Sequence, residues 1–121
     1  GYNVCIISGG KNEGVRIRLR NLGIHDIHLG SPDKVETFNE YIELYKIEPE
    51  QVLYMGDDIP DYLVMQKVGL PTCPQDAVQE IKGVSKYISH ANGGKGAVRD
   101  VIEQVMKVQG KWMDDFDAKF F

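Results

Sequence analysis

The chain has 121 residues, with 14 Lys and Arg against 18 Asp and Glu, so its net charge is −4. This length predicts a single domain, and 42% hydrophobic with 26% charged residues excludes a disordered or fibrous protein. The acidic balance and the lack of a Lys/Arg-rich run argue against nucleic acid or membrane as a partner. No apolar stretch approaches the roughly 20 residues that a membrane-spanning helix needs.

Two features indicate the context of the chain. It begins at Gly1 rather than Met and leads directly into an apolar run, so we expect an N-terminal piece to be missing. Cys5 and Cys73 form no disulfide framework and no metal-type spacing with the three histidines. We therefore expect two free thiols that act as small apolar side chains, in the reducing cytoplasm.

Short apolar runs alternate with amphipathic segments along the chain. In chain order we predict a strand at 4–7, a helix at 11–22, a strand at 26–29, a helix at 34–46, a strand at 51–55, a helix at 61–68, a strand at 70–73, a helix at 77–82, a strand at 86–89 and a helix at 97–109. Strict alternation predicts an α/β fold with a doubly wound parallel sheet and right-handed crossovers.

The last predicted helix and the tail after it raise separate questions. In the helix we predict that Val98, Val101 (or Ile102), Val105 and Val108 face inward. Residues 112–121 hold four of the 11 aromatic residues. They form either a frayed end or a segment that docks on another subunit. We therefore divide the chain into a core at 1–111 and an aromatic tail at 112–121.

Polar clusters follow three of the predicted strands, where sites form in doubly wound sheets. Ser8-Gly9-Gly10 presents backbone N–H groups and a hydroxyl to an anion. Lys34 begins a helix, a position that the helix dipole disfavours unless an anion lies nearby. Asp57 and Asp58, with Asp61, place carboxylates together, and hard carboxylate oxygens suit Mg²⁺.

Each cluster has a structural alternative. Ser8 alone is typical of a helix N-cap, and Asp57 and Asp61 alone are typical of a turn residue and a cap. A hydroxyl, a fixed cation and a carboxylate pair at three strand ends of one sheet together indicate a site that handles a phosphate.

These segments resemble motifs two, three and four of the haloacid dehalogenase superfamily: Ile6-Ile7-Ser8-Gly9, Asp33-Lys34 and Tyr54-Met55-Gly56-Asp57-Asp58-Ile59-Pro60-Asp61. Within it, residues 56–69, Gly93-Gly94-Lys95-Gly96-Ala97-Val98-Arg99-Asp100 and Gln109-Gly110-Lys111 are similar to the small, cap-less 3-deoxy-D-manno-octulosonate (KDO) 8-phosphate phosphatases. The resemblance implies a Mg²⁺-dependent phosphatase of lipopolysaccharide biosynthesis that acts on a sugar-acid phosphate, in a homotetramer.

The resemblance also implies roles for individual residues. Ser8 would hydrogen-bond the transferring phosphoryl group, Lys34 would neutralise it, and Asp57 would ligate Mg²⁺. The remaining expected roles are orientation of the lysine and the metal's waters by Asp58 and Asp61, and substrate binding by Gly9, Gly10 and Arg18, the last reaching the site from a neighbouring subunit. A solvated helix face is the structural alternative for Arg18.

The sequence departs from the family at the nucleophile. The family's first strand ends in Asp-x-Asp, and no such motif lies ahead of Ser8; Asp115-Phe116-Asp117 follows no predicted strand. We expect the missing strand to lie at the centre of the sheet, between the strands that end at Ile7 and Met55, and this chain alone to be inactive. The alternative function is a non-catalytic assembly module like those fused to sialic acid cytidylyltransferases. The family often carries a side chain such as Arg at the position of Gly10, which leaves the exact sugar acid open.

Overall fold

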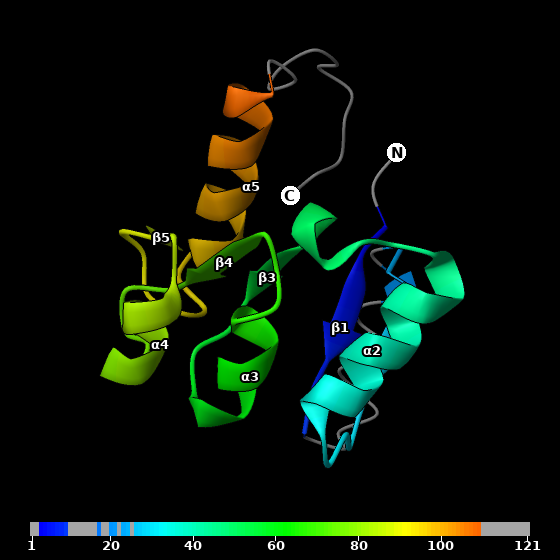
Figure 1. Ribbon diagram of the computed structural model, residues 1–121. Coiled ribbons are helices and arrows are strands. Elements are labelled where there is room, and N and C mark those ends of the chain that lie inside the picture. Colours follow the sequence, from blue (N-terminus) through cyan, green and yellow to red (C-terminus); the bar gives the residue numbers. More distant parts are fainter. Residues whose placement is uncertain (1–2, 10–16, 18–19, 22, 25, 110–121) are drawn as a thin grey trace. The chain divides into compact units, whose positions relative to one another are not determined.

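The computed structural model describes residues 3–9, 17, 20–21, 23–24 and 26–109 (Figure 1). It divides into two compact units, Gly1–Ile47 and Glu48–Phe121. The predicted helix at 11–22 and the tail at 112–121 fall mostly or wholly outside the described residues. No helix in the described part of the chain is long and apolar enough to cross a membrane.

The first unit contains a two-stranded parallel sheet and one described helix. Strand β1 (Cys5–Ile7) pairs with β2 (Asp26–His28), with Cys5 opposite Asp26. Helix α2 (Lys34–Tyr45) contacts β1 and buries Phe38. The Asp33 carboxylate caps α2, because it accepts hydrogen bonds from the amides of the second and third helical residues at 3.0 and 3.2 Å.

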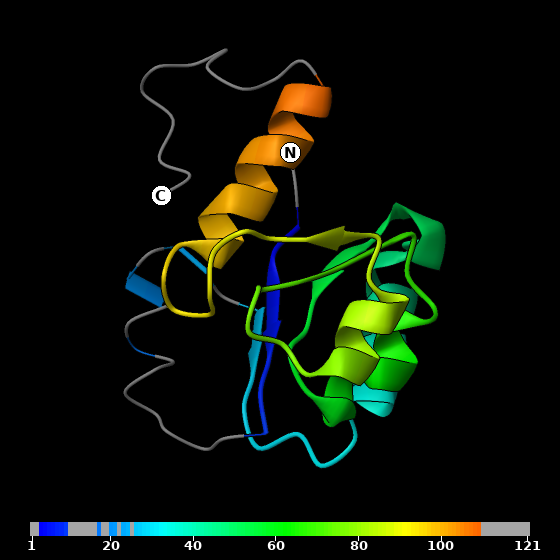
Figure 2. The same ribbon diagram turned by 90° about the vertical axis from the view of Figure 1, so that its left-hand side faces the viewer.

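The second unit contains a three-stranded parallel sheet in the order β3-β4-β5. Its elements in chain order are η1 (Pro49–Gln51), β3 (Leu53–Met55), η2 (Ile59–Asp61), α3 (Tyr62–Met65), β4 (Leu70–Cys73), α4 (Gln79–Val84), β5 (Tyr87–Ile88) and α5 (Ala97–Val108). Helices α3 and α4 lie on one side of this sheet and α5 on the other (Figures 1 and 2). Helices α3 and α4 share a side because two right-handed crossovers run in the same direction along the sheet.

The core of the second unit lies between its sheet and α3 and α4. Its buried residues are Met65, Cys73, Ala77 and Ile81, with Tyr54, Tyr62 and Val84 packed against them. Cys73 is free and fully buried, and Cys5 is free and half-buried, so the prediction of two unpaired thiols is confirmed.

The predicted α/β class and the parallel pairing of the strands are confirmed. Strand β1 pairs with β2 in the first unit, and β3, β4 and β5 pair in that order in the second.

Several predicted boundaries are wrong at their ends. The strand predicted from residue 51 begins at Leu53, because Pro49–Gln51 forms a 3₁₀ turn. The helix predicted from Asp61 begins at Tyr62, after a second 3₁₀ turn that contains Asp61. The helix predicted at 77–82 is displaced to Gln79–Val84. Short 3₁₀ turns commonly connect elements and carry no apolar periodicity of their own.

The predicted inward face of α5 is confirmed at Val101, which is buried, and is wrong at Val98 and Val108. Val98 and Val108 are 60% and 88% exposed, and the buried side chains are those of Ala97, Asp100, Val101 and Met106. Ala97, Asp100 and Val101 lie within about 100° of one another around the helix, whereas Met106 lies about half a turn from Ala97. Val98 and Val108 are the second and last residues of α5, so the two exposed valines lie at the ends of the helix.

Candidate functional site

The loop after β3 is organised around the buried carboxylate of Asp61. This side chain is only 3% exposed. Its Oδ2 accepts hydrogen bonds from the amides of Asp57 (3.0 Å) and Asp58 (3.3 Å), and its Oδ1 accepts one from the Tyr54 hydroxyl (2.6 Å). Asp61 therefore holds the backbone of the two residues that precede η2, which is a structural task that the sequence prediction did not include.

Gly56 allows Asp61 to approach the end of β3 this closely. A Cβ atom at Gly56 would lie 2.5 Å from Cβ of Asp61 and 2.8 Å from Sδ of Met65. Real Cβ atoms do not make such contacts, so any side chain here would displace Asp61 or the α3 residue below it. The glycine in the Gly56-Asp57-Asp58 segment is thus required by packing beneath the loop.

Asp57 and Asp58 themselves are exposed at the end of β3. The Asp58 carboxylate accepts a hydrogen bond from the Ile59 amide at 2.8 Å and caps η2. The main-chain oxygen of Asp57 accepts a hydrogen bond from the Val78 amide at 3.1 Å, which joins this loop to the segment after β4. The side chain of Asp57 is thus carried on a backbone held from both sides.

The first unit brings the ends of β1 and β2 together. The Ser8 amide donates to the main-chain oxygen of His28 at 2.8 Å, and the Ser31 amide donates to the main-chain oxygen of Ser8 at 3.0 Å. These bonds continue the β1–β2 ladder into the loop that leads to Lys34, the first residue of α2. Ser8 and Lys34 are both half-buried, and Gly9 is exposed.

The predicted residues are therefore distributed as follows. Ser8, Gly9 and Lys34 lie at the strand ends of the first unit, and Asp57, Asp58 and Asp61 lie at the end of β3 in the second. Gly10 and Arg18 lie outside the described residues. The sequence prediction missed the capping role of Asp33, although an Asp immediately before an apolar-periodic run is a recognised helix start.

Two further observations concern metal ligands and nucleophiles among the described residues. Within the described ranges, no three His, Cys, Asp or Glu side chains are grouped so that they could hold a metal ion. Burial, with a smaller contribution from Asp26, raises the pKa of the Cys5 thiol to about 11. A thiol with this pKa is almost wholly protonated near neutral pH, so Cys5 is unsuited to act as a nucleophile.

Comparison with known proteins shows to which family the chain belongs. Residues 12–102 match the family model of the haloacid dehalogenase-like hydrolases. The chain belongs to that family. The matched segment of this haloacid dehalogenase-like chain contains Lys34, Asp57, Asp58 and Asp61, while Ser8 lies just ahead of it.

Individual relatives narrow the similarity. The chain is 40% identical over 108 residues to 3-deoxy-D-manno-octulosonate 8-phosphate phosphatase of Salmonella typhi. This alignment covers 89% of this chain and 57% of that protein. The crystal structure of the Yersinia pestis phosphatase of the same name matches with a TM-score of 0.89 at 34% identity, covering 93% of this chain and 60% of that one.

A third match contains ligands. The Moraxella catarrhalis phosphatase of this name, solved in complex with magnesium, phosphate and KDO, has a TM-score of 0.86 at 32% identity over 90% of this chain and 63% of that one. Among the curated relatives, the matches span about 57% of each relative's length.

Proposed function

We propose that the protein containing this chain is a Mg²⁺-dependent phosphatase that hydrolyses KDO 8-phosphate to KDO and phosphate in the cytoplasm. The 40% identity to a phosphatase of that name supports the substrate. The observation that carries the proposal for this chain is the exposed Asp57 at the end of β3, on a backbone fixed by the buried Asp61. A carboxylate placed in this way is suited to bind a divalent cation that acts on an anionic substrate such as a phosphate ester.

The residues present fit Mg²⁺ as a partial ligand set. Mg²⁺ is usually held by one or two carboxylates together with waters and substrate phosphate oxygens, so a full cage of side chains is not needed. Asp57 is the carboxylate that we assign to the ion, and Asp58 lies beside it. When bound, the cation supplies charge stabilisation to the phosphoryl oxygens.

The other two strand ends supply groups for the phosphate. Ser8 carries a hydroxyl that can donate to a phosphoryl oxygen, and the Gly9 amide extends the same loop. Lys34 supplies a positive charge from the first turn of α2. We propose that Ser8 and Lys34 bind the transferring group while Asp61 and Asp58 hold the loop of Asp57.

We propose that the attacking group comes from a part of the protein outside these 121 residues. The family's nucleophilic Asp belongs to an Asp-x-Asp motif, which is absent ahead of Ser8. We propose that an upstream strand carries it, that attack forms an aspartyl phosphate and that water then releases phosphate. Gly10 and Arg18 remain assigned to substrate binding, and the active protein is proposed to be a homotetramer in which Arg18 serves a neighbouring site.

The test compares the complete gene product with the 121-residue chain. We expect phosphate release from KDO 8-phosphate by the former in the presence of Mg²⁺ and none by the latter. Release by the 121-residue chain at a similar rate would contradict the upstream nucleophile. A complete gene product that releases no phosphate would contradict the phosphatase assignment and favour an assembly module.

A second measurement addresses the metal directly. Asp57→Asn removes the carboxylate charge assigned to Mg²⁺, so we expect calorimetry on the complete gene product to show weaker Mg²⁺ binding. Asp58→Asn is the comparison variant: it removes a neighbouring exposed carboxylate that is assigned to hold the loop and not to ligate the ion, so we expect it to affect mainly the geometry of the loop and to weaken Mg²⁺ binding less than Asp57→Asn. Equal Mg²⁺ affinity in the wild-type and Asp57→Asn proteins would contradict the assignment.

A further inference from the structure

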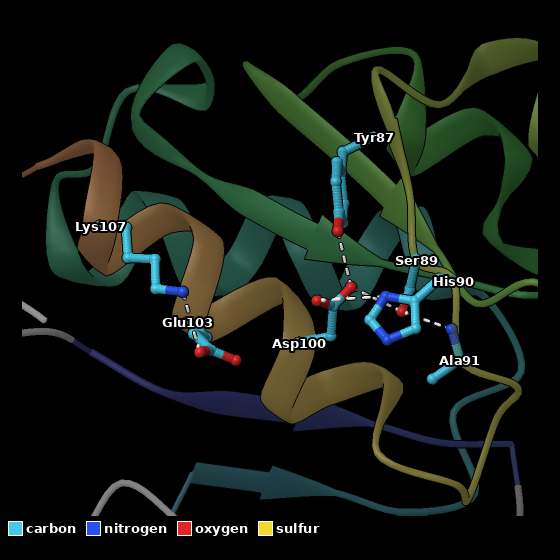
Figure 3. Close-up of polar contacts among 7 residues, drawn as sticks. All are labelled: Tyr87, Ser89, His90, Ala91, Asp100, Glu103 and Lys107. Carbon is cyan, nitrogen blue, oxygen red and sulfur yellow. Dashed lines mark hydrogen bonds and ion pairs between the residues drawn. The ribbon is translucent and has the colours of Figure 1, made fainter.

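Asp100 forms a buried polar network that the proposed reaction does not use. This first-turn residue of α5 is 6% exposed. Its Oδ2 accepts hydrogen bonds from the Tyr87 hydroxyl at 2.6 Å and the Ser89 hydroxyl at 2.8 Å (Figure 3). Burial alone would raise the pKa of Asp100, but the bonds from Tyr87 and Ser89 hold it below its usual value, so the carboxylate is ionised at neutral pH.

The presence of Ser89, His90 and Asp100 together does not make a hydrolytic triad. In a triad the serine donates to the histidine, whereas Ser89 donates to Asp100 and is fully buried. His90 is an exposed partner, with Nδ1 3.5 Å from Oδ1 of Asp100 and a side chain that is 82% exposed. The network therefore has no accessible nucleophile, and its role must be sought in what it holds.

What it holds is the glycine-rich loop between β5 and α5. The Ser89 hydroxyl oxygen accepts a hydrogen bond from the Ala91 amide at 3.0 Å, so Asp100 fixes the start of this loop through Ser89. The loop then passes through Gly94 and Gly96, whose φ angles of 74° and 96° lie in the left-handed region. A loop built on such glycines has high conformational freedom when unanchored, so fixed contacts at its ends determine where it lies.

The same loop is joined to the segment after β4, and that segment to Asp57. The Gln75 amide donates to the main-chain oxygen of Ala91 at 2.9 Å, and the Gly93 amide donates to Oδ1 of Asp76 at 2.8 Å. Two residues after Asp76, the Val78 amide donates to the main-chain oxygen of Asp57. Hydrogen bonds thus connect all three strand ends of this sheet, from α5 to the loop after β3.

We propose that Asp100 is a positioning residue that, through Ser89, anchors the loop at 89–96 and the segment at 75–78 and so fixes the backbone of Asp57. Its importance for Mg²⁺ use rests on the proposed function, but the coupling between the three loops does not. Ser89 and Tyr87 make separable contributions: both donate to the same carboxylate oxygen, but Ser89 also holds the Ala91 amide. This difference gives a matched pair of variants.

The test is site-resolved amide hydrogen exchange on the complete gene product without metal. Ser89→Ala is expected to reduce protection of the Ala91, Gly93 and Val78 amides by about tenfold, because it removes the link between Asp100 and the loop. Tyr87→Phe is expected to leave these three amides within about twofold of wild type. Glu103→Gln, which removes the ion pair between half-buried Glu103 and exposed Lys107 on the same helix, is expected to change none of them.

Two outcomes would overturn the coupling. The first is a Ser89→Ala protein in which Ala91 exchanges faster while Val78 keeps its wild-type protection. The second is equal loss of Val78 protection in Ser89→Ala and Tyr87→Phe, which would indicate general destabilisation. If the Ser89→Ala and Tyr87→Phe proteins are folded and the exchange result holds, we expect Ser89→Ala to raise the Mg²⁺ concentration for half-maximal phosphate release by about threefold. The thermal stabilities of the two variants are expected to be similar. An unchanged Mg²⁺ requirement would refute the effect on Asp57. Absence of phosphate release by the wild-type protein would refute the proposed function without affecting the exchange result.

Discussion

Asp61→Asn tests whether the buried carboxylate of Asp61 organises the loop that carries Asp57. The substitution keeps the size of the side chain but removes its charge and replaces one acceptor oxygen by a donor NH₂ group. In the wild-type protein both oxygens face donors: the amides of Asp57 and Asp58 on one side and the Tyr54 hydroxyl on the other. No orientation of an asparagine amide reproduces this set.

The expected loss follows from these three bonds. With the asparagine oxygen toward the two amides, each bond changes from a charged to a neutral acceptor, which costs about 1 kcal/mol per bond. The NH₂ group then faces Tyr54, whose hydroxyl can turn to accept, at a further loss of about 1 kcal/mol. We therefore expect Asp61→Asn to lower the free energy of unfolding by about 3 kcal/mol.

Urea unfolding of the complete gene product measures this difference. Tyr54→Phe removes one of the three bonds and should lower the free energy of unfolding by about 1–2 kcal/mol. Glu50→Gln changes an exposed carboxylate in η1 and should remain within about 0.5 kcal/mol of wild type. An Asp61→Asn protein that also lies within about 0.5 kcal/mol of wild type would refute the reasoning, because the buried bonds would then contribute little.

Three further predictions concern other parts of the chain. Gly56→Ala should lower the free energy of unfolding by about 1–3 kcal/mol, because its Cβ would lie 2.5 Å from that of Asp61. Gly83→Ala is the control and should not be destabilising, because an added Cβ there would meet nothing within 4 Å. If thermal unfolding showed Gly83→Ala to be the less stable of the two, the packing account would be contradicted. Lys46→Gly should raise the free energy of unfolding by about 1 kcal/mol, because Lys46 ends α2 with a φ of 55°, and a less stable variant in urea would show that the lysine side chain has an overriding role. The hydrogen bond to Asp100, followed by burial, raises the pKa of Tyr87 from 10.0 to about 12, so the folded state holds this proton more tightly than the unfolded chain. The resulting stability is complete below pH 10 and lost between pH 10 and about 12, so the difference between wild type and Tyr87→Phe should shrink over that window; a constant difference would contradict the shift.

The sequence alone determined the class of the fold and the strand ends at which the candidate groups lie. The alternation of apolar and amphipathic runs predicted every described strand and helix, because these periodicities depend on residues close together in the chain. Ser8, Lys34 and Asp57 follow β1, β2 and β3 as predicted. Only the short turns η1 and η2, which have no period of their own, were missed or merged with their neighbours.

Tertiary structure decided which polar groups are buried and what they hold. In the sequence, Asp61 resembles an ordinary helix cap. It is buried in the structure because Tyr54 donates a hydrogen bond to it and because Gly56, which has no side chain, lets it approach the end of β3. Asp100 is buried although the sequence predicted only apolar side chains on the inward side of α5, and its partners Tyr87 and Ser89 lie 13 and 11 residues earlier in the chain. Hydrogen bonds between such distant residues form only after strands and helices have packed, so no local pattern in the chain records them.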